Sequence, residues 1–222
     1  MEVFQSKIID IKKVTHNVRS YTIEKPAGYS YTPGQATEIS VLKDGWEKEK
    51  RPFTFTSLPE SKHLEFTIKS YTDHDGVTNQ LYHLQPGDHF EIGDAWGAIS
   101  YNGEGVFIAG GAGVTPFIAI FRDLHAGGRV GNNKLFFSNK KTEDIILKEE
   151  FENILGENFI NIISRERTED YYHGRIDKAY LQQNISNFNQ SFYVCGPDAF
   201  TAQILDALKE LGADAEALVF EK

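Results

Sequence analysis

Cysteine is nearly absent from this chain, which has one, Cys195, among its 222 residues. A single cysteine excludes an internal disulfide, a cysteine-ligated zinc site of the usual four-ligand kind and an iron–sulfur cluster held by cysteines alone. We expect no metal site. Any redox chemistry must therefore use another kind of cofactor.

Long hydrophobic runs are also missing. No segment approaches the roughly 20 apolar residues that cross a membrane as a helix. The amino-terminal stretch "MEVFQSKIIDIKKV" has no apolar core of signal-peptide length and alternates like a strand. These two features predict a cytoplasmic protein without a membrane span.

Basic residues are outnumbered, with 23 Lys+Arg against 32 Asp+Glu and a formal net charge of -9. This charge repels a phosphate backbone, so we expect no nucleic-acid partner. Hydrophobic residues make up 40% and charged residues 25% of the chain, as in ordinary globular proteins. The length allows one large domain or two small ones, and the sequence carries no signal for the oligomeric state.

The first half of the chain alternates polar and apolar residues in short segments. These segments are "SKIIDIKKV", "VRSYTIEKP", "QATEISVL", "RPFTFTSLP" and "LEFTIKSYT", and turn signals such as "KPAG", "TPGQ", "KDGW" and "QPGD" separate them. Many short, evenly spaced strands are typical of an antiparallel barrel or sandwich. We assign this half to a first domain, residues 1–100.

The second half has a different pattern. Compact apolar strands, "GVFIAGG", "KLFFSN", "FINIIS", "SFYVCG" and "EALVFE", alternate with segments of helical spacing. In one of these segments, 198–212, Asp198 is expected to cap the helix and Gly212 to end it. The alternation predicts an open α/β domain with a parallel sheet over residues 101–222.

A glycine-rich turn links a strand to a helix in "VFIAGGAGVTPFIAIF". Gly110, Gly111 and Gly113 would let the backbone approach a phosphate, and the helix amino end offers free N–H donors. Pro116 suits the first helical turn. A tight turn without a ligand is the alternative interpretation.

Two further signals lie at predicted strand ends. In "FYVCGPDAF", Cys195 would lie at the rim of a ligand crevice, although a free cysteine is more often a small buried core residue. After the strand "FINIIS", three arginines surround a loop and suit a nucleotide 2′-phosphate. They are Arg165, Arg167 and Arg175. Alternatively, they pair with the acidic residues of the loop, which are Glu166, Glu169 and Asp170.

Taken together, these motifs resemble the ferredoxin-NADP reductase superfamily over essentially the whole chain. Four stretches occur in the family's order: "RPFT", "GVTNQL", "GGAGVTPF" and "VCGPD". The resemblance implies an amino-terminal antiparallel β-barrel that holds a flavin. It also implies a following nucleotide domain that delivers hydride from NAD(P)H.

On the flavin side, the resemblance gives roles to the residues of "RPFT". Arg51 would bind the flavin pyrophosphate, Phe53 would lie against the ring system, and the Thr54 hydroxyl would hydrogen-bond the atom that accepts hydride. The family usually has tyrosine where this chain has Phe53, which keeps the ring but loses the phenol. In a regular strand Arg51 and Phe53 share one face and Pro52 and Thr54 the other, so we expect Pro52 to bend the strand.

The resemblance also gives roles along the rest of the cleft. Ile68 and Lys69 would line the flavin with their backbone, and Gly76, Val77 and Thr78 would cradle its pyrophosphate unless this stretch is a hairpin with a polar turn. Cys195 would lie where flavin and nicotinamide meet. The remaining expected contacts with the cofactors are Gly111, Gly113, Thr115, Gly196, Pro197, Phe220 and Glu221, the last two belonging instead to a core strand in the alternative interpretation.

The expected cofactors are FAD and NADP(H). Ser164, Arg165 and Arg175 resemble the residues that NADPH-using members place around the 2′-phosphate, so we expect NADPH rather than NADH. The expected reaction passes hydride from NADPH to FAD and then electrons to a separate carrier such as ferredoxin or flavodoxin. A reductase of free flavin or another small acceptor, a flavin-bearing subunit of a larger complex and a nucleotide-binding regulatory module are the alternatives.

Overall fold

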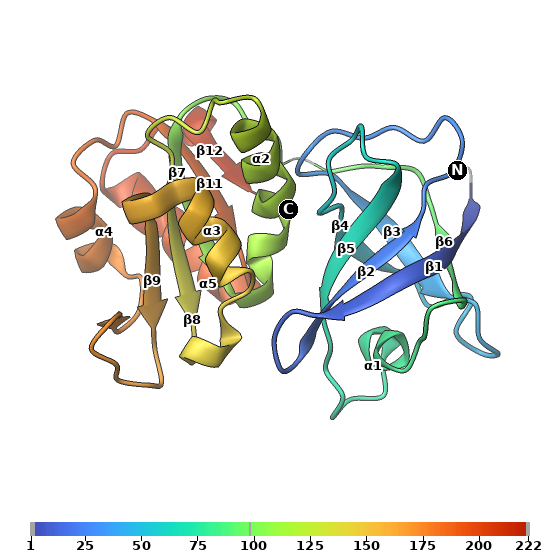
Figure 1. Ribbon diagram of the computed structural model, residues 1–222. Helices are drawn as coiled ribbons and strands as arrows, with labels where there is room; N and C mark the ends of the chain where they lie inside the picture. The colour runs from blue at the N-terminus through green and yellow to red at the C-terminus, as the bar shows by residue number, and fades with distance from the viewer. Residues whose placement is uncertain (1–2, 98, 221–222) are drawn as a thin grey trace.

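The computed structural model describes residues 3–97 and 99–220. Two lobes lie side by side, a β-barrel formed by the first half of the chain and an α/β lobe formed by the second (Figure 1). The expected boundary at residue 100 falls between the last barrel strand and the first strand of the α/β lobe. The longest described helix has 13 residues, and none in the described part of the chain is long and apolar enough to cross a membrane.

Six antiparallel strands form the barrel in the order β4-β3-β6-β1-β2-β5. A bridge between Phe55 and Phe66 brings the two ends of the sheet together, so the barrel is nearly closed. Both rings are fully buried in the barrel core. The strands are β1 (Phe4–Lys13), β2 (Val18–Glu24), β3 (Ala36–Val41), β4 (Arg51–Thr54), β5 (His63–Lys69) and β6 (His89–Ile92). The predicted barrel is confirmed.

Two elements of the barrel lobe were not anticipated. Strand β6 has only four residues, too few to show a clear alternation. Helix α1 (Val77–Tyr82) forms in "GVTNQL", with Gly76 at its N-cap and Val77 and Leu81 buried. The alternative of a hairpin at this stretch was therefore wrong, because apolar residues four apart fit one face of a helix.

The second lobe contains six parallel strands in the order β10-β9-β8-β7-β11-β12. They are β7 (Gly105–Gly110), β8 (Lys134–Asn139), β9 (Phe159–Ile163), β10 (Tyr172–His173), β11 (Ser191–Cys195) and β12 (Leu218–Phe220). The predicted open parallel sheet is confirmed. Its five expected strands are present, and the two-residue strand β10 is an addition at the edge.

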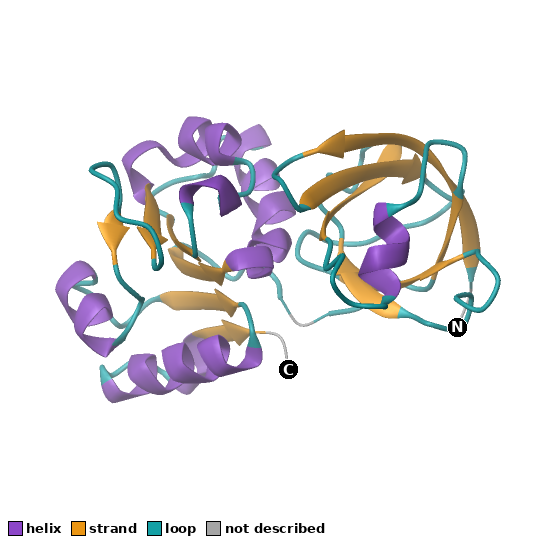
Figure 2. Ribbon diagram, turned by 90° about the horizontal axis from the view of Figure 1, so that it is seen from below, coloured by secondary structure: helices purple, strands orange, loops and turns teal. Residues whose placement is uncertain are grey.

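Helices cover both faces of this sheet (Figure 2). One core cluster contains apolar residues of α2 (Thr115–Ala126) and α3 (Lys148–Leu155), and another contains those of α4 (Lys178–Asn184) and α5 (Asp198–Glu210). Short 3₁₀ turns complete the lobe: η1 (Gly111–Val114), η2 (Thr142–Asp144), η3 (Gly156–Asn158) and η4 (Ala215–Ala217).

The helix ends follow the sequence signals in part. Pro116 lies in the first turn of α2. Gly212, with φ +94°, follows the end of α5 in the left-handed region that glycine adopts without strain. Asp198, however, is the first residue of α5 and makes no side-chain cap, because Pro197 occupies the N-cap. The expected cap was therefore wrong, although a carboxylate in the first turn still suits the helix dipole.

Candidate functional site

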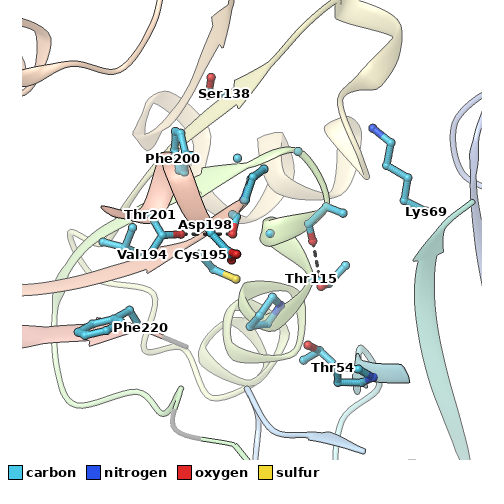
Figure 3. A pocket seen from close by; sticks show the side chains of 18 of the residues that line it. Thr54, Lys69, Thr115, Ser138, Val194, Cys195, Asp198, Phe200, Thr201 and Phe220 are labelled. Atoms are coloured by element: carbon cyan, nitrogen blue, oxygen red, sulfur yellow. Dashed lines mark hydrogen bonds between the residues drawn. The ribbon is translucent and has the colours of Figure 1, made fainter. Parts of the chain in front are cut away.

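A cavity of about 1010 Å³ opens between the two lobes. Its floor in the α/β lobe is formed at the carboxyl ends of the parallel strands, which is where open sheets bind ligands. Strands β4 and β5 form the opposite wall. In Figure 3, Thr54 and Lys69 lie on the barrel side, and Cys195, Phe200 and Phe220 lie on the other.

The barrel wall begins with β4, where Pro52, Phe53 and Thr54 all border the cavity. This strand lies at the edge of the sheet order, where proline costs no ladder hydrogen bond. Pairing with β3 continues without a register shift through Pro52, which lies opposite Glu38. The Thr54 hydroxyl forms no hydrogen bond with another described residue, which leaves it available to a ligand.

Arg51 precedes these residues but does not line the cavity. Its guanidinium donates a hydrogen bond to the Lys50 carbonyl at 2.7 Å and lies 3.6 Å from the Glu49 carboxylate. Its side chain is 55% exposed. Arg51 would therefore have to change its rotamer to reach a cofactor pyrophosphate.

The expected residues of β5 and α1 separate into two groups. Ile68, Lys69 and Thr78 line the cavity. Gly76 and Val77 do not, and the Val77 side chain is 3% exposed and packs in the barrel core. Their backbone N–H groups nevertheless lie at the amino end of α1, where helical N–H groups lack an intrahelical partner.

The wall formed by the α/β lobe is called the nucleotide wall below. The two glycines of its turn, Gly111 and Gly113, lie in different surroundings. Gly111 has φ +54°, and a Cβ added there would meet nothing within 4 Å. At Gly113 a Cβ would lie 2.4 Å from the carbonyl oxygen of Cys195 and 2.5 Å from the N of Gly196. Gly113 is therefore needed for close packing of the turn on β11, whereas Gly111 faces open space. Thr115 also lines the cavity, and its hydroxyl donates to the Ala112 carbonyl at 3.0 Å.

Cys195 is the last residue of β11. The sequence suggested either the rim of a crevice or a buried core position, and the residue has features of both. It is 8% exposed and belongs to a core cluster, and it also lines the cavity. Gly196, Pro197 and Phe220 line the cavity with it. The expected contact at Glu221 lies outside the described residues.

The arginine loop follows β9. Ser164 lines the cavity and donates its hydroxyl to the Asn139 carbonyl at 3.2 Å. Arg165 and Arg175 are exposed and do not line it. Neither forms an ion pair within the described part of the chain. Instead, Glu166 accepts a hydrogen bond from the Thr142 N–H at 2.8 Å, and this bond lowers the pKa of its carboxyl.

Several lining residues were missed. Ser138, Asn139 and Lys140 stand at and just after the carboxyl end of β8, and the rule for parallel strand ends could have found them. Asn139 is 4% exposed, and its Nδ2 is buried without a hydrogen-bond partner among the described residues. Trp96, 42% exposed, reaches the cavity through a bridge between its backbone and Ala36, which no local pattern could predict.

The arrangement fits a flavin and a nicotinamide nucleotide. Aromatic rings on both walls suit planar ring systems, and the wall also offers a free hydroxyl, an unpartnered buried amide and an open positive-φ glycine to polar groups. No cluster of metal-binding side chains occurs in residues 3–97 and 99–220. The lining of the cavity therefore suits organic ring systems with polar substituents.

Two family profiles match the chain in succession. The family described as "Oxidoreductase FAD-binding domain" matches residues 5–101, and "Oxidoreductase NAD-binding domain" matches residues 107–206. The first covers the barrel, and the second covers most of the α/β lobe. The chain therefore carries an FAD-binding and an NAD-binding domain.

Curated relatives share the domain pair at low identity. NADH-cytochrome b5 reductase 2 of Mycosarcoma maydis is 28% identical over 85% of this chain, and the flavohemoprotein of Bacillus subtilis strain 168 is 24% identical over 86%. The chain spans only 60% and 51% of the lengths of these two relatives.

Solved structures share the fold. A ferredoxin NADP+ reductase from Neisseria gonorrhoeae, crystallised with bound FAD and NADP, superposes with a TM-score of 0.85 at 18% sequence identity. The superposition covers 100% of this chain and 98% of that one. The likeness extends over both lobes.

Proposed function

The chain belongs to the ferredoxin-NADP reductase-like superfamily of FAD- and NAD(P)-binding oxidoreductases, and on this premise we propose that it transfers hydride from NADPH to FAD and then electrons to a separate carrier protein. The observation that supports the proposal most strongly is the cavity between the lobes. Thr54 of the FAD-binding domain and Cys195 of the NAD-binding domain border this same cavity from its two walls.

Bound FAD supplies the redox chemistry, because it accepts hydride as a pair of electrons and can release them singly. The protein positions the two cofactors and excludes water from the transfer site. We propose that the Thr54 hydroxyl donates a hydrogen bond to the flavin atom that accepts hydride, and that Phe53 packs against the ring. Cys195 is small and 8% exposed, so it can form an apolar floor at the transfer site. The transfer itself needs no general base from the chain.

The preference for NADPH is proposed from the arginine loop. Arg165 and Arg175 are exposed and form no ion pair among the described residues, so both guanidinium groups are available to a phosphate. Ser164, beside them, reaches the cavity. Changing both arginines to Ala should lower the ratio of kcat/KM for NADPH over NADH by about tenfold or more, since each charge-assisted hydrogen bond contributes about 1.5–3 kcal/mol. An unchanged ratio would show that the 2′-phosphate binds elsewhere or is not recognised.

The carrier is proposed to be a one-electron protein such as ferredoxin or flavodoxin. The test is steady-state turnover of the FAD-loaded protein with ferredoxin, flavodoxin, cytochrome b5 and free FMN as acceptors. Higher kcat/KM with ferredoxin or flavodoxin supports this choice. Cytochrome b5 is the second candidate, because a relative at 28% identity is an NADH-cytochrome b5 reductase. Higher turnover with free FMN than with any protein would identify a flavin reductase instead.

A further inference from the structure

Arg122 of α2 connects the two lobes through its guanidinium group. Nη1 donates to the Thr56 carbonyl and to Glu65 Oε1, both at 2.6 Å, and these acceptors belong to the barrel lobe. Nε and Nη2 donate to the two carboxylate oxygens of Glu150 in α3, at 2.5 and 2.9 Å. One side chain therefore holds two elements of its own lobe together and also binds the opposite lobe.

This network is largely withdrawn from solvent. The Arg122 side chain is 22% exposed, that of Glu65 26% and that of Glu150 33%. Burial alone would raise the pKa of Glu65, but the charge of Arg122 and hydrogen bonds from Arg122, Thr56 and Ser20 outweigh it and lower the pKa. The ion pair is thus formed throughout the neutral range. A planar guanidinium with several fixed donors defines direction as well as distance.

Each arm of the network leads to one wall of the cavity. Thr54 and Thr67 both line the cavity. The two acceptors of Arg122 in the barrel are close to them in the chain, since Thr56 comes two residues after Thr54 and Glu65 two residues before Thr67. Thr115 lines the cavity at the first residue of α2, and Arg122 lies about two helical turns further along the same helix. In Figure 1, α2 lies on the side of the α/β lobe that faces the barrel. The guanidinium therefore connects α2, which begins at the nucleotide wall, with the strands that form the barrel wall.

A second contact between the lobes is mainly apolar. Val14 of the turn between β1 and β2 and Val18, the first residue of β2, pack in the core cluster of the α/β lobe, and Val18 is 2% exposed. Next to it, His16 Nε2 lies 3.7 Å from Asp144 Oδ1. Apolar contact is not directional, so this turn can hold the lobes together without fixing the angle between them.

From these contacts we propose that Arg122 is a positioning residue for hydride transfer: it fixes the angle between the lobes and thereby the distance between the two cofactor sites. The proposal rests on the proposed function. Its physical basis is the steep dependence of the reaction on geometry, since a misplacement of about 1 Å can cost about 100-fold in rate. Arg122 does not line the cavity, so it acts through β4, β5 and α2 rather than by contact with a cofactor.

The test compares the FAD-loaded wild type with Arg122→Met and Glu65→Gln. Rapid mixing with saturating NADPH gives the limiting rate of flavin reduction, normalised to bound FAD. Hydrogen exchange without nucleotide reports the mobility of residues 14–18. We expect both variants to lose about tenfold or more in the limiting rate. We also expect faster exchange at 14–18 and an apparent Kd for NADPH close to that of the wild type.

Two controls separate positioning from general damage. Arg129 follows the end of α2 and forms a 2.7 Å ion pair with Asp123 of that helix, which does not reach the barrel. Arg129→Met removes this pair and should leave the limiting rate and the exchange at 14–18 unchanged. Arg122→Lys keeps the positive charge but lacks the planar guanidinium with its several donors. Its limiting rate should lie between those of Arg122→Met and the wild type. If Arg122→Met fails to fold, Glu65→Gln still removes the negative charge that faces Arg122 from the barrel, while the Thr56 carbonyl remains as an acceptor.

An unchanged limiting rate in Glu65→Gln and in any soluble Arg122→Met protein would overturn the proposal. So would a loss that appears only as weaker NADPH binding. If neither nucleotide reduces the FAD of the wild type, the proposed function fails. The hydrogen-exchange comparison then still decides whether Arg122 holds the lobes, because it needs no turnover.

Discussion

Thr54 is the side chain of the barrel wall for which we propose a direct part in hydride transfer. It is half-buried, lines the cavity and makes no hydrogen bond within the described part of the chain. A hydroxyl left free at the edge of a half-buried wall is available to a ligand atom. Thr56, two residues beyond the end of the strand, is fully buried and already hydrogen-bonded to Glu65 and Thr67, so the two threonines serve different purposes.

Replacing Thr54 by Val removes the hydroxyl at similar volume. We expect flavin reduction by NADPH to slow by about tenfold to 100-fold, because the removal of one positioned donor commonly costs about 100-fold or more. Rapid mixing with FAD-loaded protein measures the rate. Thr22→Val, on β2 and away from the cavity, is the matched control. Equal rates for Thr54→Val and the control would contradict the proposed role.

At the scale of elements, the turn between β7 and α2 combines close packing with backbone that is exposed to the cavity. Gly113 allows the turn to contact the end of β11, and this contact brings Cys195 beside the nucleotide wall. Gly111 in the same turn has no such neighbour. The sequence motif therefore combines a structural glycine with one that leaves backbone exposed to the cavity.

Gly113→Ala should lower the free energy of unfolding by about 1–3 kcal/mol, because the added methyl would overlap backbone atoms that cannot move aside. Gly93→Ala is the control, since a Cβ there would meet only Thr37 Oγ1 at an ordinary 3.7 Å. Urea unfolding without nucleotide measures both. A Gly113→Ala protein as stable as Gly93→Ala would show that the turn relaxes and that its close packing on β11 does not require glycine.

The sequence predicted the elements that have a clear period or a strong motif. The five named strands of the α/β lobe and the antiparallel barrel are of this kind, as is Pro116 in the first turn of α2. Strand β6 and helix α1 are too short to show a clear hydrophobic period. They form because Phe90 of β6 and Leu81 of α1 are buried in the barrel core. Long-range placement was equally inaccessible: Trp96 reaches the cavity through Ala36, and Arg51 points away from it toward Glu49.

At the scale of the whole molecule, the charge network of Arg122 also links stability to pH. Glu65 has a pKa below its usual 4.5, despite burial, because of Arg122 and of hydrogen bonds to its carboxylate. A carboxyl whose pKa is lower in the folded state than in the unfolded state contributes its full stabilisation at a pH above its unfolded-state pKa. The contribution is lost as the pH falls through the folded value.

Glu65→Gln should therefore lower the free energy of unfolding most at pH 7, by about 1–3 kcal/mol. The difference from the wild type should shrink as the pH falls below about 4.5, where the unfolded carboxyl becomes protonated. Urea titrations at fixed FAD concentration across pH 3–7 measure it. The exposed Glu157→Gln, without an ion pair among the described residues, is the control. A difference that is constant with pH would rule out this linkage.

We propose that FAD on the barrel and a nicotinamide nucleotide on the α/β lobe meet in one cavity for hydride transfer. Rapid mixing of the FAD-loaded wild type with NADPH, and separately with NADH, tests it most directly. We expect the absorbance of bound FAD to be bleached in a single turnover, and faster with NADPH than with NADH. Bound FAD that neither nucleotide reduces would contradict it.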